Sequence, residues 1–111
     1  MIKTIQDLHE HLQWAIELEH ATIPPYLCAL YSIKDNSNQE SIEVIQSVFI
    51  EEMLHMALVA NIMIATGGKP QLDYPEFIAR YPTPLPHSDK SFEVNLNKFS
   101  PESIECFLKI E

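Results

Sequence analysis

Glycine is nearly absent from this 111-residue chain, because only two occur and they are adjacent at Gly67 and Gly68. Proline is unevenly placed, since six of the eight prolines lie at or after position 70. Glycine and proline are the residues that most often interrupt helices and strands. The sequence therefore predicts an uninterrupted first part, a boundary near residue 67 and an irregular second part.

Basic residues are also scarce. Only 7 Lys and Arg stand against 16 Asp and Glu, which gives a formal net charge of -9. No basic face is available to neutralise a phosphate backbone or an anionic lipid surface, so we expect neither nucleic acid nor an acidic membrane as a partner. The excess of carboxylates suits cations, although an acidic surface exposed to water has the same composition.

Long hydrophobic runs and paired cysteines are missing as well. The most apolar stretch, Met56–Ala65, is interrupted by Asn61 and has about half the length of a bilayer span, so we expect no membrane segment. The first seven residues lack the apolar core of a signal peptide. Cys28 and Cys106 lie far apart without CxxC spacing. These features together lead us to expect a cytoplasmic protein with free thiols.

Apolar residues recur at helical spacing from about residue 5 to 33 and again up to Gly67. The polar stretch 34–38 separates the two helices, and Ser37 with Glu40 forms a capping-box pattern for the second. A connector this short makes the helices antiparallel neighbours, so residues 1–67 are predicted to form a helical hairpin.

The second part is expected to be mostly irregular. Residues 68–99 form a proline-rich crossing segment with a possible short strand at 92–96. Ser100 and Pro101 are typical of a helix start, which predicts a short helix at 100–111. We therefore expect one all-α domain over residues 1–111.

Three chemically unusual residues fall on the buried faces of the predicted hairpin. Glu19 lies inside the apolar stripe of the first helix, and Glu52 and His55 lie on the apolar face of the second. Burying an unpaired carboxylate costs several kcal/mol, so these groups should be paired, hydrogen-bonded or bound to a metal. The connector also places Glu19 opposite the midpoint of Glu52 and His55. A Glu from one helix and Glu-x-x-His from its neighbour is half of a ferritin-like di-metal carboxylate site, which suits iron or manganese better than zinc.

Other polar residues near these positions allow more than one interpretation. A single Glu-x-x-His pattern often marks only an exposed helix face, and Glu17 with His20 is interpreted in this way. Glu51 lies at the edge of the stripe, where it is either a solvated acid or an additional partner of the metal site. Tyr26 either fills the core or donates a hydrogen bond to a ligand.

Several motifs resemble one known family, the ferritin-like domain named after iminophenyl-pyruvate dimer synthase, which is found in the violacein enzyme VioB and its relatives. The resemblance lies in the stretches Ala15–Leu27, Glu51–Met56, Gly67–Gly68, Tyr81–Pro86 and Phe99–Glu102. It implies a four-helix, non-haem metal-binding fold in which Glu19, Glu52 and His55 match the acidic and histidine positions of the first helical pair. Glu51 matches the first acid of the motif. The synthase reaction is not implied, because nothing in the chain offers haem ligation.

Members of that family continue through a second helical pair, whereas this sequence ends at Glu111. The later half of the second helix is apolar almost all round, which indicates a further partner. The residues on the sides that the first helix cannot cover are Ile50, Leu54, Ala57, Leu58 and Ile64. A homodimer would bring two sets of ligands together, and a truncated domain would explain the same features.

We therefore expect a non-haem iron protein with a di-iron carboxylate site completed across a homodimer, and with redox or oxygen-dependent chemistry on an unknown small molecule. A non-catalytic helical module for dimerisation or docking, or a fragment of a larger VioB-like domain, is the alternative. Iron storage is less favoured, because a single site offers no mineral cavity.

Overall fold

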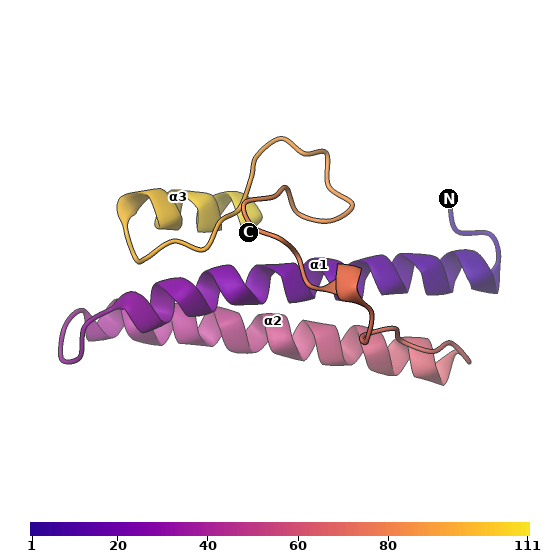
Figure 1. Ribbon diagram of the computed structural model, residues 1–111. Coiled ribbons are helices and arrows are strands. Elements are labelled where there is room, and N and C mark those ends of the chain that lie inside the picture. Colours follow the sequence, from indigo (N-terminus) through magenta and orange to yellow (C-terminus); the bar gives the residue numbers. More distant parts are fainter.

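The computed structural model describes residues 1–111 and contains three α-helices and no strand (Figure 1). Helices α1 (Ile5–Ser32) and α2 (Gln39–Ala65) form an antiparallel hairpin, and α3 (Pro101–Ile110) follows a long connecting segment. One turn of 3-10 helix, η1 (Pro75–Phe77), interrupts that segment. The predicted all-α fold, a hairpin followed by a short C-terminal helix, is confirmed.

The start of α2 differs from the prediction. Ser37 does not cap this helix, because its hydroxyl donates to the carbonyl oxygen of Lys34 at 2.6 Å. Asn38 is the cap instead, in a left-handed conformation with φ 42°, and its side chain accepts a hydrogen bond from the amide of Ser41. Asparagine tolerates this conformation better than most residues, which lets the connector turn sharply before α2 begins.

The end of α2 lies where the glycines predict it. Gly67 has φ 85°, and its amide donates to the carbonyl oxygen of Ile64 at 3.0 Å. The amide of Gly68 donates to the carbonyl oxygen of Met63 at 2.8 Å. These two bonds form the Schellman arrangement that commonly terminates helices with a left-handed glycine.

Two prolines inside α1 fix the position of the connecting segment. Pro24 and Pro25 have no amide hydrogen, so the carbonyls of His20 and Ala21 lose their usual helical donors. Tyr81 replaces one of them, because its hydroxyl donates to the carbonyl oxygen of Ala21 at 2.6 Å. Burial raises the pKa of Tyr81 to about 12, so its donor proton is retained at neutral pH. The prolines therefore create an acceptor that holds the segment against α1.

The connecting segment has no regular strand, so the strand expected at 92–96 is wrong. A single antiparallel bridge joins Thr83 to Val94, and the Val94 side chain is fully buried. The prolines around Thr83 cannot donate to a ladder, so the pairing does not extend beyond one bridge.

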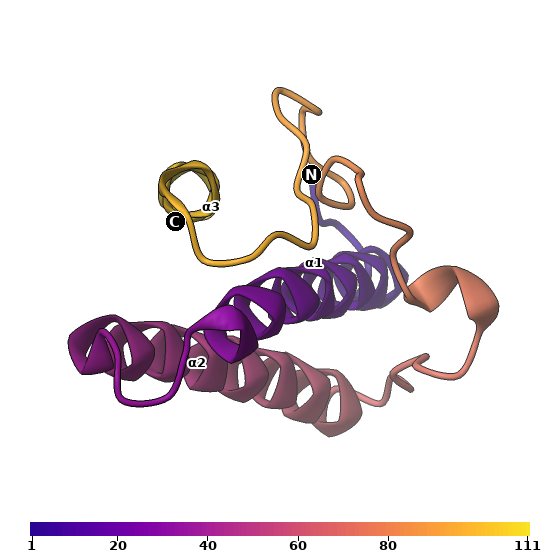
Figure 2. The same cartoon turned by 60° about the vertical axis from the view of Figure 1, so that its left-hand side comes forward.

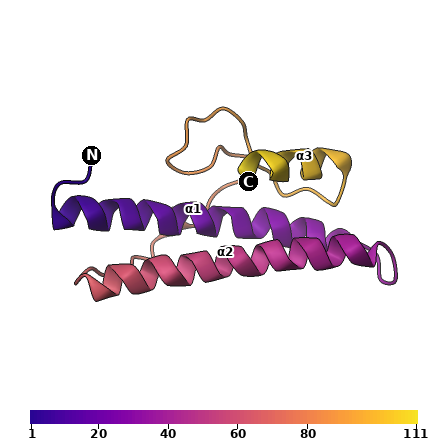
Figure 3. The same cartoon turned by 180° about the vertical axis from the view of Figure 1, so that it is seen from behind.

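Two small hydrophobic clusters hold the helices together. One joins α1, α2 and α3 through Tyr26, Ala29, Ile45 and Phe107. The other joins the opposite end of the hairpin to η1 through Ile16, Met63 and Phe77. Helix α3 lies on the opposite side of α1 from α2 in two opposite views (Figures 1 and 3). Glu19, Glu52 and His55 occupy the middle of the hairpin, between the two clusters.

The chain exposes more surface than a compact domain of its mass. Only 13 of 111 residues are buried, and the accessible surface is 7447 Å², whereas a compact monomer of this mass exposes about 6,300 Å². No segment covers the side of α2 that faces away from α1 in any of the three views (Figure 2). By length and composition alone, α2 is the one helix that could cross a membrane. The expectation of no apolar segment long enough for a bilayer is therefore not met by α2, of whose most apolar window 11% is buried.

We expect Tyr81→Phe to lower the free energy of unfolding by about 1–3 kcal/mol, because it leaves the carbonyl of Ala21 without a donor. Chemical denaturation followed by circular dichroism measures this change. Tyr31→Phe is the matched control, since the Tyr31 side chain is exposed and its hydroxyl has no partner within the chain. Equal stability of the two variants would contradict the role assigned to Tyr81.

Candidate metal centre

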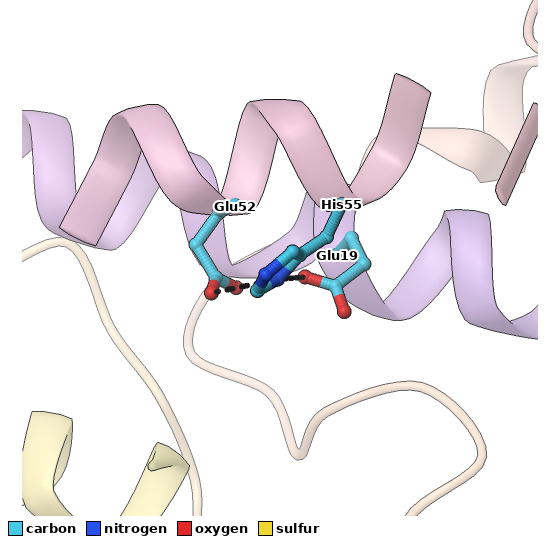
Figure 4. Close-up of side chains that lie close together, drawn as sticks. All are labelled: Glu19, Glu52 and His55. Carbon is cyan, nitrogen blue, oxygen red and sulfur yellow. Dashed lines mark ion pairs between the residues drawn. The ribbon is translucent and has the colours of Figure 1, made fainter. Parts of the chain in front are cut away.

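The structure brings Glu19, Glu52 and His55 together at the middle of the hairpin (Figure 4). One ligand atom from each residue lies within 4.8 Å of the other two. His55 Nδ1 lies 3.6 Å from Glu19 Oε2 and 3.7 Å from Glu52 Oε1. The three side chains point toward the side on which α3 lies. The predicted candidate residues therefore share one location and one orientation.

The spacing of these atoms fits a shared cation better than direct hydrogen bonds. Contacts of 3.6 and 3.7 Å exceed the usual hydrogen-bond range. Two ligand atoms that each lie about 2.1 Å from one metal ion are separated by about 3–4 Å. Two carboxylates and one imidazole form a donor set that suits iron, manganese or zinc. The residues present therefore fit a divalent cation.

Thr22 is a part of the site that sequence reasoning missed. Its hydroxyl donates to Glu52 Oε2 at 2.6 Å and lies 2.9 Å from the carbonyl oxygen of Glu19. Thr22 and Glu52 are both buried. The hydrogen bond holds one oxygen of Glu52 and leaves Oε1, the oxygen nearest His55, available for a ligand bond. The sequence feature that could have identified Thr22 is a polar residue three positions after Glu19 on the same helix face.

The electrostatics of the site favour a bound positive charge. Burial and the neighbouring carboxylate of Glu52 raise the pKa of Glu19 to about 7, and His55 offsets only part of this shift. Two carboxylates in contact resist simultaneous ionisation unless a cation lies between them. Half of the His55 side chain is exposed, at 48%, so the ring side of the site is open to solvent.

A third acidic residue, Glu111, lines the same cavity. This cavity has a volume of about 250 Å³, and its lining includes Glu19, Glu52, His55 and Glu111. The hydroxyl of the buried Tyr26 donates to Glu111 Oε1 at 2.7 Å, and the Tyr26 ring packs on Phe107. Tyr26 therefore fills the core and also orients an acid. Glu111 lies in line with the apolar stripe of α3, one turn after Phe107. An acid within an apolar stripe is also the pattern that identified Glu19.

Glu51 and Glu17 lie outside the cavity. Glu51 is exposed and is not a member of the Glu19, Glu52 and His55 group. The expectation that Glu17 faces solvent is wrong, because Tyr74 donates to Glu17 Oε1 and His87 Nε2 lies 2.5 Å from Oε2. Burial acts to raise the pKa of Glu17, but these hydrogen bonds outweigh it and lower the pKa. Glu17 therefore anchors the connecting segment rather than contributing a ligand.

His20, the other half of that pattern, also lies away from the site. Its Nδ1 atom is buried without a hydrogen-bond partner, and its ring packs on Phe77 at a centroid distance of 4.3 Å. Burial lowers the pKa of His20. The Glu17 and His20 pair is therefore not a second metal motif.

Comparison with known families agrees with this geometry. A family model described as Ferritin-like matches residues 12–111. The chain belongs to the ferritin-like family. No curated protein and no solved structure gave a significant match. Ferritin-like bundles use carboxylates and Glu-x-x-His motifs on facing helices to bind metals, which is the pattern that Glu19, Glu52 and His55 follow.

We expect Glu19→Gln to stabilise the metal-free ferritin-like chain at about pH 8, by on the order of 1 kcal/mol after allowance for solvent screening. The pKa of Glu19 is raised in the fold from 4.5 to about 7. This group therefore favours the fold fully below about pH 4.5, and the contribution is lost as the pH rises through about 7.

Thermal unfolding of chelator-treated protein across this pH range measures the difference between Glu19→Gln and wild type. The stabilisation should vanish in acid. Glu43→Gln on the exposed side of α2 is the control and should change nothing. A Glu19→Gln chain that is less stable than wild type at high pH would contradict the repulsion between Glu19 and Glu52.

We expect Thr22→Val to weaken the binding of Fe(II) or Mn(II) by about tenfold or more, because the isosteric side chain cannot donate to Glu52. Anaerobic titration calorimetry measures the affinity. Thr22→Ser keeps the hydroxyl and should bind within a few-fold of wild type. If the serine and valine variants bind equally, the hydrogen bond does not orient Glu52.

Proposed function

We propose that this ferritin-like chain binds iron at Glu19, Glu52 and His55, with Glu111 as an additional carboxylate. The observation that supports this most strongly is the meeting of three ligand atoms within 4.8 Å at a place where apolar side chains would otherwise pack. Thr22 and Tyr26 orient two of the acids, which is typical of the hydrogen bonds that surround metal ligands. Manganese and zinc are the competing occupants.

We further propose a di-iron centre that needs one more helix. Two-metal sites of this kind combine one Glu from each of two helices with Glu-x-x-His from each of two others. Glu19 and Glu111 supply the single acids, and Glu52 with His55 supplies one Glu-x-x-His. The second such motif has to come from a helix beside α2 and α3. There Val44, Val48, Ile104 and Leu108, among others, line an apolar cavity of about 150 Å³.

The sequence analysis expects a second copy of the chain to supply that helix. Pairing two hairpins face to face would bring both copies of Glu52 and His55 together. In that arrangement α3 would have to move aside, because Ile110 and Glu111 line the cavity onto which the ligands point. Glu19 of the second copy would then take the place of Glu111 as the second single acid. Metal content and oligomeric state measured on the same sample test this arrangement.

The activity we propose is redox or oxygen-dependent chemistry on a small molecule. Bound iron would supply that chemistry, and open coordination positions would admit the reactant. The exposed side of His55 and the cavity beside it give access to the site. The narrower relationship, to the ferritin-like domain of iminophenyl-pyruvate dimer synthase, rests on the motifs around Glu19 and Glu52.

The competing function is a helical docking module that holds no metal. The exposed apolar side of α2 favours it, because contiguous apolar surface is typical of interaction sites. In that case the carboxylates would be held by Thr22, His55 and a shared proton alone. Metal analysis separates the two functions.

We expect about one iron per chain in protein purified without chelators after iron supplementation, the ratio of a two-metal site shared by two chains. Glu52→Ala should lose this iron, because it removes the central buried ligand. Elemental analysis measures the content, and Glu43→Ala is the control on the same helix.

Glu111→Gln should weaken iron binding without abolishing it, since three ligands remain. Iron retained at the wild-type ratio in Glu52→Ala would overturn the ligand assignment. A wild-type chain without metal, even after reconstitution with Fe(II), would favour the docking module.

A further inference from the structure

The side of α2 that faces away from α1 forms a largely apolar surface, which we call the outer face. Its residues are Ile50, Leu54, Ala57, Leu58, Asn61 and Ile64. All six are exposed, and the exposed fractions of the four large apolar side chains are 50% for Ile50, 54% for Leu54, 49% for Leu58 and 60% for Ile64. No other part of the chain lies against this face (Figures 1–3).

The outer face is distinct from the metal centre and from the cavity beside α3. Glu52 and His55 point toward α3, whereas Ile50 and Leu54 project from other sides of the same helical turns. A helix that completed the metal site would lie against Val44 and Val48. It would leave the outer face uncovered. A separate partner is therefore needed to remove this surface from water.

The distribution of charge favours an antiparallel copy of the same helix. Residues 53–68 contain no Asp, Glu, Lys or Arg, although the chain carries a net charge of -9. In an antiparallel pair centred on Ala57, Glu51 lies opposite position 63 of the second copy, which is Met, so the acids of the two copies do not meet. A parallel pair would place each acid beside its own equivalent, which is unfavourable.

The spacing of side chains is self-complementary about Ala57. Ile50 and Ile64 lie seven residues before and after it, so a twofold axis at Ala57 places each Ile50 opposite Ile64 of the other copy. Seven residues correspond to about two helical turns, so all three residues share one side of the helix. The small Ala57 side chain permits close approach at the axis, and Leu54 and Leu58 flank the contact.

The chain leaves more surface exposed than a compact monomer of its mass. The chain exposes 7447 Å², which is about 1,200 Å² more than a compact monomer of its mass. A standard stable interface buries about 800 Å² on each partner. The uncovered outer face is one part of this surplus.

We propose that two copies of this chain associate through the outer face, with their α2 helices antiparallel and Ala57 near the twofold axis. The contact is isologous, because the same residues of each copy meet. It leaves the two candidate metal centres on the far sides of the dimer, so the face-to-face pairing proposed for the di-iron site would join two such dimers. It does not depend on bound metal, so it stands or fails separately from the proposed iron site.

Sedimentation analysis of four chelator-treated proteins tests this interface, because metal removal excludes the pairing that would share the iron site. Wild type should sediment with the mass of two chains, and Leu54→Glu should halve that mass, because it places a charge in the centre of the contact. Leu108→Glu, on the exposed side of α3, is the matched control and should remain dimeric. Glu52→Ala should also remain dimeric, which separates this result from metal loss.

Cross-linking gives a test that does not rely on a destabilising charge. In a background with Cys28 and Cys106 replaced by Ser, Ala57→Cys should form an intermolecular disulfide on mild oxidation, since the two residues meet at the axis. Glu10→Cys, on the exposed side of α1, should not. A reducing gel lane confirms the disulfide.

Three results would overturn the proposal. The first is a monomeric wild type. The second is a dimer that Leu108→Glu dissociates and Leu54→Glu does not, which would place the interface beside α3. The third is a chain that floats with neutral phosphatidylcholine vesicles and does not dimerise, which would identify the outer face as a membrane contact.

Discussion

Two carboxylates meet in the middle of the hairpin, and the surrounding structure is organised around the cost of this contact. Removing ionised carboxylates from water costs several kcal/mol each, which is comparable with the net stability of a small domain. Thr22 donates a hydrogen bond to one oxygen of Glu52, and His55 lies close enough to both acids to offset part of their desolvation cost. The raised pKa of Glu19 shows that the compensation is incomplete. A divalent cation would supply the rest, so the architecture and the proposed function share one physical cause.

The connecting segment and α3 form a second layer over the hairpin, and their position depends on a short part of α1 next to the site. Within residues 21–26, the carbonyl of Ala21 accepts from Tyr81, Thr22 donates to Glu52, and Tyr26 donates to Glu111. The free carbonyl exists because Pro25 has no amide hydrogen. One and a half turns of helix thus position the connecting segment, a ligand and α3. The Pro24-Pro25 pair therefore does not break the helix. It leaves a carbonyl free to bind the connecting segment.

The hairpin and the three central residues could be predicted because both depend on local periodicity. Helical spacing identifies the buried faces, a short connector sets the level of one helix against the other, and an acid on an apolar face stands out. Thr22 was missed because threonine is unremarkable on a buried face until its partner is known. Glu111 carried the same signal as Glu19, but it lies beyond the last apolar residue of a short helix.

Predictions for the polar exterior and the connecting segment were less successful, for a related reason. Helical periodicity placed Glu17 on the face away from the hairpin partner, which is correct, but that face is covered by Tyr74 and His87. Those partners lie 57 and 70 residues away in sequence. Contacts of this range are set by the path of an irregular segment, and no periodic pattern encodes that path. The choice of Asn38 over Ser37 as a cap likewise depends on how the connector turns.

Helix α2 carries three different environments around one axis, which explains why its composition resembles a membrane span. One side packs on α1, a second presents Glu52 and His55, and the third is the exposed outer face. Neighbouring residues therefore belong to different contacts. Ile50 and Leu54 lie on the outer face, while Glu52 between them is buried at the candidate metal centre. A rigid helix links these two sites within two turns, so an interface at the outer face would restrain the backbone that carries the ligands. A second apolar face beside the one packed on α1 therefore gives α2 the composition that also suits a membrane span.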